Sequence, residues 1–225
     1  MKLAVLFSGG KDSTLALERA MKKEEVVCLI SLLSKNPESY MFHTPNIGLT
    51  KLQAEAMGFP LIQKITEGEK EREVEDLRHA IEKAKRKFGI EGVVTGGVES
   101  VYQAERFQRV CDSLDLWCFN PLWLGDQKEL LREAAEKFEV IISGVFAFPL
   151  GSEWLGRKID RRTAEELVKL NEKYQISPAG EGGEFETLVL DAPFFKKRIE
   201  ILEAEKRFEK NSGVFLVKKA KLVEK

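Results

Sequence analysis

Six residues near the start of the chain, Ser8 to Ser13, combine the residue types that hold a phosphate group. Gly9 and Gly10 allow positive φ angles and let the backbone approach a ligand closely. Lys11 adds a mobile positive charge, and the hydroxyls of Ser8 and Ser13 add short hydrogen-bond donors. The segment therefore predicts an anion-binding turn.

Asp12 is the member of this segment that does not suit an anion site, because a carboxylate repels phosphates unless a cation lies between them. We interpret Asp12 as a magnesium contact, made directly or through water, since Mg²⁺ at nucleotide sites is held by one or two carboxylates together with phosphates. The simpler alternative is that the dipole at the start of a helix favours Asp12. That alternative leaves Lys11 and the paired glycines unexplained.

The elements on either side would position this turn. Leu3 to Phe7 is an apolar run typical of a buried strand, and residues 14–21 have apolar positions at helical spacing. A helix that starts here directs its unpaired N–H groups and the positive end of its dipole toward a ligand. The spacing is not that of a Walker A loop. It resembles the PP-loop, SGGKDS, of the ATP pyrophosphatase superfamily, whose members cleave ATP between the α and β phosphates.

Apolar runs and amphipathic stretches alternate over the first half of the chain. This alternation predicts an α/β fold with a doubly wound, mainly parallel sheet. Ligands in such sheets bind outside the carboxyl ends of the strands, so Ser31 and the Gly96-Gly97 turn are expected to join Ser8, Gly9 and Gly10 at the nucleotide. We expect strands at 3–7, 26–33, 60–65, 92–97 and 117–119, and helices at 14–21, 46–56 with Asn46 as N-cap and Gly58 as its end, 69–88 and 101–114.

The second half of the chain has a different pattern, and we place a boundary after the Asn120-Pro121-Leu122-Trp123 stretch. This gives a nucleotide-binding domain over 1–124 and a smaller C-terminal α+β domain over 125–225. We expect helices at 127–138 and 161–174, the second capped by Asp160, and a buried strand at 140–146. Residues 196–225 alternate apolar and polar positions around a turn at 211–213, which predicts a closing antiparallel hairpin.

Three glutamates, Glu181, Glu184 and Glu186, lie among glycines just before and within an apolar run. Their charge has the wrong sign for a phosphate cradle. Carboxylates in this arrangement suit a cation, an amine or ammonium, and they can also act as general bases. The alternative is a solvated acidic turn, which is common in a Glu-rich chain.

The composition limits the class of protein. The 225 residues carry 36 basic and 37 acidic side chains, a formal net charge of −1, whereas an extended nucleic-acid surface normally shows a strong basic excess. No apolar run approaches the roughly 20 residues needed to cross a bilayer, and the start has no signal-peptide pattern, so we expect a cytoplasmic protein. Many Lys and Glu residues with few Met and Cys are typical of heat-adapted, thermophilic proteins.

The three cysteines, Cys28, Cys111 and Cys118, form no C-x-x-C pair. A disulfide framework and a zinc site are therefore poorly supported. Cys28 lies in an apolar run and is interpreted as a small core residue. A catalytic thiol at Cys111 or Cys118 is the weaker interpretation.

Four segments in order identify a family resemblance. They are SGGKDS, the Ser39-to-Asn46 segment SYMFHTPN, Tyr102-Gln103 with Arg106, and the Glu181-to-Pro193 segment EGGEFETLVLDAP. Together they resemble the diphthine–ammonia ligase family, the amidating enzymes of diphthamide synthesis. The likeness covers nearly the whole chain, and EGGEFETLVLDAP is its most specific part. It implies an adenine nucleotide alpha hydrolase-like (HUP-type) domain followed by a smaller domain that shapes the acceptor site.

The resemblance also implies a reaction. A diphthine carboxylate on translation elongation factor 2 would be adenylated by ATP with Mg²⁺, and ammonia would then attack the acyl-adenylate to give diphthamide, AMP and pyrophosphate. The chain shows no glutaminase portion, which favours free ammonium as the nitrogen source. Family members of eukaryotic type often carry extra C-terminal domains, and none fits in 225 residues. The oligomeric state is left open, a homodimer being one option.

The matching motifs imply roles for individual residues. Tyr102, Gln103 and Arg106 line the acceptor or the triphosphate, the alternative being an ordinary polar helix face. His43 contacts the nucleotide, the alternative being an unengaged loop histidine. The implied catalytic residues are Lys11, Glu184 and Glu186; the nucleotide ligands Ser8, Gly9, Gly10, Lys11, Asp12, Ser13, Ser31, His43, Gly96 and Gly97; the acceptor ligands Tyr102, Gln103, Arg106, Glu181, Gly182, Gly183 and Thr187; and the metal ligand Asp12.

Two other functions compete with the ligase. A PP-loop enzyme that acts on RNA is opposed by the near-neutral charge and by the absence of paired cysteine motifs. A non-catalytic ATP-binding module is opposed by the intact Lys-Asp-Ser set at residues 11–13, which relatives that only sense nucleotide generally lack. Fold likeness alone does not establish the acceptor.

Overall fold

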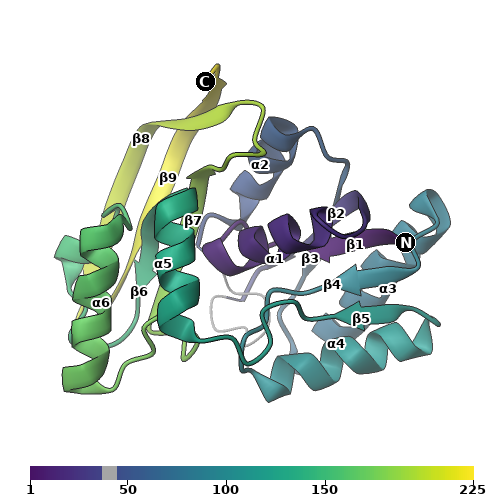
Figure 1. Ribbon diagram of the computed structural model, residues 1–225, viewed down its shortest axis with the longest axis horizontal. Helices are drawn as coiled ribbons and strands as arrows, with labels where there is room; N and C mark the ends of the chain where they lie inside the picture. The colour runs from purple at the N-terminus through teal and green to yellow at the C-terminus, as the bar shows by residue number, and fades with distance from the viewer. Residues whose placement is uncertain (37–44) are drawn as a thin grey trace.

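Five parallel strands form the sheet of the amino-terminal half (Figure 1). In the computed structural model, which describes residues 1–36 and 45–225, they lie in the order β3-β2-β1-β4-β5, and every neighbouring pair is parallel. Leu3, Ala4 and Val5 of the central strand are all buried, as expected for a strand covered on both faces. The strands span Lys2–Leu6 (β1), Glu25–Ser34 (β2), Leu61–Thr66 (β3), Gly92–Val94 (β4) and Trp117–Phe119 (β5).

Helices cover both faces of this sheet, which confirms the predicted doubly wound α/β fold. Leu3 and Val5 pack in one core with α1 and α2, whereas Ala4, between them, packs in another with α3 and α4. This alternation follows from the two-residue period of a strand. The helices span Lys11–Met21 (α1), Thr50–Met57 (α2), Lys70–Phe88 (α3) and Val101–Ser113 (α4).

A separate antiparallel sheet, in the order β7-β6-β9-β8, forms the C-terminal part. Helix α5 lies between α6 and α1 (Figure 1), and ion pairs of Glu133 with Arg19 and of Lys137 with Glu18, each at 2.8 Å, join α5 to α1. The elements span Gln127–Lys137 (α5), Glu139–Val145 (β6), Arg161–Tyr174 (α6), Phe185–Asp191 (β7), Arg198–Glu209 (β8) and Ser212–Val223 (β9).

One hydrophobic core runs through both parts of the chain. It contains Val5 and Leu17 of the first part together with Leu131, Val140 and Leu167 of the second. The predicted boundary after residue 124 falls in the turn between β5 and α5, and the division into two domains there stays a prediction. Among the described residues, no helix is both long enough and apolar enough to cross a membrane.

The helix caps were predicted with mixed success. Asp160 caps α6, because its carboxylate accepts a hydrogen bond from the Thr163 N–H at 2.8 Å, and Gly58 ends α2 with φ +80°. The expected cap at Asn46 is wrong. Asn46 has φ +65° and makes no side-chain cap, since its amide instead pairs with the backbone of β9 at Phe215 and Val217, both at 2.8 Å.

The segment that leads into α2 also differs from the expectation. Residues Ile47–Leu49 form a single 3₁₀ turn before the α-helix begins at Thr50. Residues 39–44 of the SYMFHTPN segment, His43 included, lie outside the described residues. The nucleotide contact expected of His43 therefore stays a prediction.

Candidate active site

The SGGKDS turn joins the end of β1 to the start of α1, as its sequence predicts. Gly10 is the N-cap residue in extended conformation and offers no side-chain acceptor to the first turn of the helix. Helix N-termini of this kind present N–H groups to an anion. The hydroxyls of Ser8 and Ser13 lie 3.2 Å apart, and Ser13 donates to the Gly10 carbonyl at 3.1 Å. The turn therefore gathers donors at the positive end of α1.

The Lys11 side chain is almost fully buried, with 2% of the residue exposed. Its ammonium donates to Oδ2 of Asp12 at 2.8 Å and to the carbonyl of Ala179, which lies 168 residues away in the chain. The other carboxylate oxygen, Asp12 Oδ1, is buried and has no hydrogen-bond partner among the described residues. A buried acceptor without a donor fits a cation, and thus the expected magnesium contact.

Strand β7 packs directly on the SGGKDS turn, residues 8–13, which we call the phosphate turn. The Thr187 hydroxyl accepts a hydrogen bond from the Lys11 N–H at 3.1 Å, and the Val189 N–H donates to the Gly9 carbonyl at 3.0 Å. The second sheet thus contributes residues to the wall of the candidate phosphate site. Thr187, predicted as an acceptor ligand, lies at the base of this turn.

Gln53 is a site residue that the sequence analysis missed. It is completely buried, and its Nε2 donates to the carbonyls of Gly9 at 2.9 Å and Val189 at 2.8 Å. A Cβ at Gly9 would lie 2.2 Å from Gln53 Oε1, so only glycine fits there, and its φ of +82° favours glycine as well. Its spacing could have indicated that it is buried, because Gln53 follows Thr50 by three residues and precedes Met57 by four, on the buried face of α2.

Glu181 and Glu186 lie near enough to Lys11 and Asp12 for the charges of these residues to affect both glutamate pKa values. Burial, opposed by Lys11 and reinforced by the negative charges of Asp12 and Glu181, raises the pKa of Glu186 to about 7. The pKa of Glu181 is also raised, first by burial and then by the charge of Asp12. Lys11 and Asp12 of α1, Glu181 of the loop before β7 and Glu186 of β7 therefore form one charge cluster.

Glu184 has a different environment from its two neighbours. Its Oε1 accepts a hydrogen bond from the Ser177 N–H at 2.7 Å, and its Oε2 is buried with no hydrogen-bond partner in the described part of the chain. Gly182 and Gly183 are exposed beside it. The carboxylate thus holds the loop that precedes β7 through Ser177, and the catalytic role expected of Glu184 stays a prediction.

Of the remaining predicted nucleotide ligands, Gly96 and Gly97 lie in the turn after β4, and Ser31 lies within β2. A Cβ at Gly96 would lie 2.9 Å from the Ser13 nitrogen, so the turn after β4 touches the first turn of α1. Gly97 follows it in the same turn. Ser31 is buried, and its hydroxyl donates to the Phe7 carbonyl at 2.6 Å. Its nucleotide contact stays a prediction.

Helix α4 begins beside the acidic loop. The Glu99 N–H, two residues before the helix, donates to Oε2 of Glu181 at 3.3 Å. Within the helix, the Arg106 guanidinium carbon lies 3.5 Å from the centre of the Tyr102 ring, a stacked cation–π contact. The Gln103 N–H is capped by Ser100 at 3.4 Å. Tyr102, Gln103 and Arg106 therefore lie on the helix that follows Glu99, and Glu99 contacts Glu181 of the charge cluster.

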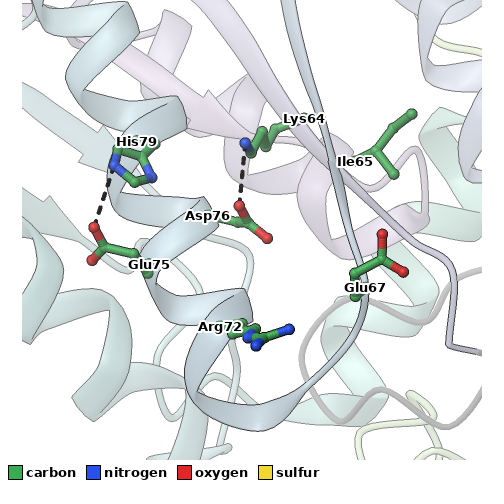
Figure 2. Close-up of a pocket in the computed structure, with 7 residues that line it drawn as sticks. All are labelled: Lys64, Ile65, Glu67, Arg72, Glu75, Asp76 and His79. Atoms are coloured by element: carbon green, nitrogen blue, oxygen red, sulfur yellow. Dashed lines mark ion pairs between the residues drawn. The ribbon is translucent and has the colours of Figure 1, made fainter.

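A surface depression of about 360 Å³ lies elsewhere, between the end of β3 and α3. Figure 2 shows its mixed charges, with ion pairs of Lys64 with Asp76 and of His79 with Glu75 at 3.2 and 3.3 Å. It contains none of the predicted site residues. His79 is exposed on α3.

The cysteines have no place in the charge cluster. Cys28 is fully buried, and burial raises the pKa of its thiol to about 12, which agrees with a small core residue. Cys111 and Cys118 share a hydrogen bond between their thiols, although no sequence motif pairs them. Both belong to the core on the α3–α4 face, opposite α1.

Across residues 1–36 and 45–225, no group of three or more His, Cys, Asp or Glu side chains is arranged to hold a metal.

The parallel sheet and the SGGKDS turn at the start of α1 define an α/β protein of the PP-loop type. Residues 1–117 match the model of the diphthamide synthase N-terminal domain, and residues 126–223 match that of the diphthamide synthase C-terminal domain. The chain therefore belongs to the diphthine–ammonia ligase family, whose members are ligases that form a carbon–nitrogen bond.

Diphthine–ammonia ligases of animals and fungi are similar to this chain in sequence. The diphthine–ammonia ligase of Rattus norvegicus is 36% identical over 226 residues, which cover 91% of this chain and 84% of that protein. The Homo sapiens ligase is 34% identical with the same coverage. The ligase of Schizosaccharomyces pombe is 34% identical over 91% of this chain, but the match covers only 37% of that longer protein.

Proposed function

We propose that this protein is a cytoplasmic enzyme that amidates diphthine on translation elongation factor 2 with ATP and ammonium. The products would be diphthamide, AMP and pyrophosphate. The observation that carries the proposal is the charge cluster, in which Lys11, buried between Asp12 and Ala179, lies close enough to Glu186 of the EGGEFETLVLDAP segment for its charge to oppose the raised pKa of that carboxyl. A site for phosphates and a site for a cationic nitrogen donor therefore adjoin.

The chemistry explains why ATP is needed. An oxygen of the diphthine carboxylate must leave, and hydroxide is a poor leaving group. Attack of that oxygen on the α phosphorus of ATP forms the acyl-adenylate and releases pyrophosphate. The nitrogen of ammonia then attacks the acyl carbon, AMP leaves with the oxygen, and the nitrogen loses a proton. Each step breaks one bond for each bond formed.

The phosphate turn would bind the nucleotide. Backbone groups of Gly9 and Gly10 and the serine hydroxyls would hold phosphates, and Lys11 would stabilise the charge of the departing pyrophosphate, a type of stabilisation that contributes strongly to catalysis. The Lys11 ammonium donates to Asp12 and to the Ala179 carbonyl, contacts that hold its charge beside the phosphate turn. Asp12 Oδ1, which has no hydrogen-bond partner within residues 1–36 and 45–225, fits Mg²⁺, which when bound would supply positive charge beside the phosphates.

Glu186 would handle the proton of ammonium. A general base works best when its pKa lies near the working pH, and burial brings the pKa of Glu186 to about 7. Glu181 would attract the ammonium ion, and Glu184 would support the loop through Ser177. Tyr102, Gln103, Arg106, Gly182, Gly183 and Thr187 would line the acceptor.

The direct test is to incubate the protein with methylated, unamidated elongation factor 2, ATP, magnesium and ammonium. We expect the mass change of replacing a hydroxyl by an amino group on the modified histidine. AMP and pyrophosphate should form only when acceptor and ammonium are both present. Release of ADP and phosphate instead would contradict the proposed cleavage between the α and β phosphates.

A further inference from the structure

Four exposed apolar side chains flank the acidic loop that carries Glu181 and Glu184. Leu124 is 73% exposed, Phe148 68% and Val101 58%, and Tyr174 is also exposed. We call this set the apolar rim. Single exposed apolar residues are ordinary, but a group around a site marks an interaction surface.

One side of the rim is tied to the loop through the segment before α4. The Leu124 N–H donates to the Val98 carbonyl at 2.9 Å, and the next residue, Glu99, donates its N–H to the Glu181 carboxylate at 3.3 Å. Val101 is the first residue of α4, two residues further on. Leu124 and Val101 therefore adjoin the Glu181 side of the loop.

The other side of the rim is tied to Glu184. The Phe146 N–H donates to the Glu184 carbonyl at 2.8 Å, and Phe148 follows two residues later. The Phe148 ring meets the Tyr174 ring edge to face, with centroids 5.3 Å apart. Tyr174 ends α6, three residues before Ser177, whose N–H donates to the Glu184 carboxylate at 2.7 Å.

The backbone at Leu124 adds an independent observation. Its φ is +55°, in the left-handed region that a bulky side chain rarely adopts. The backbone is held there by the hydrogen bond from the Leu124 N–H to the Val98 carbonyl at 2.9 Å. Here it holds an apolar side chain outward, next to the candidate active site.

We propose that the apolar rim is the docking surface for the protein acceptor, and specifically for the polypeptide around its modified histidine. This inference rests on the proposed function. The rim lies on both sides of the loop that contributes Glu181 to the charge cluster, so an acceptor that contacts both sides must be larger than a single amino acid. Aromatic residues such as Phe148 and Tyr174 are enriched at interfaces between proteins, and the rim fits an acceptor loop with apolar side chains.

The test is a double variant, Leu124→Asn with Phe148→Ser. Asparagine tolerates the left-handed conformation at residue 124, so the backbone can be kept while the apolar side chain is removed. AMP formation is measured against the concentration of diphthine-bearing elongation factor 2, and separately against ATP. We expect KM for the acceptor protein to rise at least about tenfold, while kcat and KM for ATP stay within about twofold.

The matched control is Trp117→Ser, a residue 67% exposed at the start of β5, whereas Leu124 lies in the turn after the end of that strand. It should leave KM for the acceptor within about twofold of wild type. A double variant with an unchanged acceptor KM, or with KM for ATP raised as much, overturns the docking surface. If the wild-type protein itself does not amidate the acceptor, the proposed function fails first, and the two failures are distinguishable.

Discussion

The side-chain amide of Gln53 donates to the carbonyl of Gly9 at 2.9 Å, and the same nitrogen donates to Val189 at 2.8 Å. One buried amide therefore joins the phosphate turn to strand β7 of the second sheet. This relationship makes the shape of the turn depend on the C-terminal part of the protein. It also explains why residue 9 has no room for a side chain.

Replacing Gln53 by Ala should damage both stability and nucleotide use. The change removes two hydrogen bonds to buried carbonyls and leaves a cavity, a loss of about 2–4 kcal/mol. Urea denaturation measures the stability, and KM for ATP should rise more than KM for the acceptor. Gln108→Ala, an exposed residue on α4, is the control and should change stability by less than about 0.5 kcal/mol. Equal effects of the two changes would contradict the role of Gln53.

Replacing Gly9 by Ala tests the close approach itself. The new Cβ would lie 2.2 Å from Gln53 Oε1 and would also strain a backbone with φ +82°. Gly89→Ala is the matched control, because Gly89 has φ +64° with open space around its missing Cβ. The control should cost about 1–2 kcal/mol from the φ angle alone. Gly9→Ala should cost clearly more and abolish AMP formation; similar losses would show that the contact with Gln53 is unimportant.

The ionised form of Glu186 should lower stability at high pH. Its pKa is raised from 4.5 to about 7 in the folded protein. The unfolded chain therefore releases this proton first, and the folded state loses stability as the pH rises from 4.5 to 7. Glu186→Gln, which stays neutral, should be more stable than wild type above pH 7 by on the order of 2–3 kcal/mol, with the gain shrinking toward pH 5.

Thermal unfolding of both proteins between pH 5 and 8 measures this difference. Glu203→Gln, at an exposed position of β8, is the control and should not show the same trend. A gain for Glu186→Gln that is the same at every pH would mean that the carboxylate is not the cause. Under the proposed mechanism the variant should also lose the rise of amidation rate through pH 7.

Removing the Lys11 ammonium should stop the chemical step. Lys11→Ala is expected to lower the rate of AMP formation by about 100- to 1000-fold, the usual effect of losing one group that stabilises developing charge. Lys35→Ala, at an exposed ion pair with Glu67, should keep nearly full activity. A Lys11→Ala protein that folds and amidates as well as wild type would remove Lys11 from the catalytic set.

Local patterns in the sequence were sufficient for much of the fold. The alternation of apolar runs and helical stripes predicted the doubly wound sheet, and Asp160 predicted the start of α6, because both depend on residues that are close along the chain. Asn46 shows where such reasoning stops. Asparagine suits an N-cap, but the Asn46 side chain instead makes two hydrogen bonds to β9, about 170 residues away.

Local sequence was enough to predict the phosphate turn, since a strand, two glycines, a lysine and a helix start act through neighbouring backbone geometry. The surroundings of that turn depend instead on how remote segments pack in the folded chain. Thr187 meets the Lys11 N–H across 176 residues, Gln53 reaches Gly9 from another helix, and Glu186 acquires a pKa of about 7. Each depends on burial and on distances between remote segments, which residue type and local spacing do not encode.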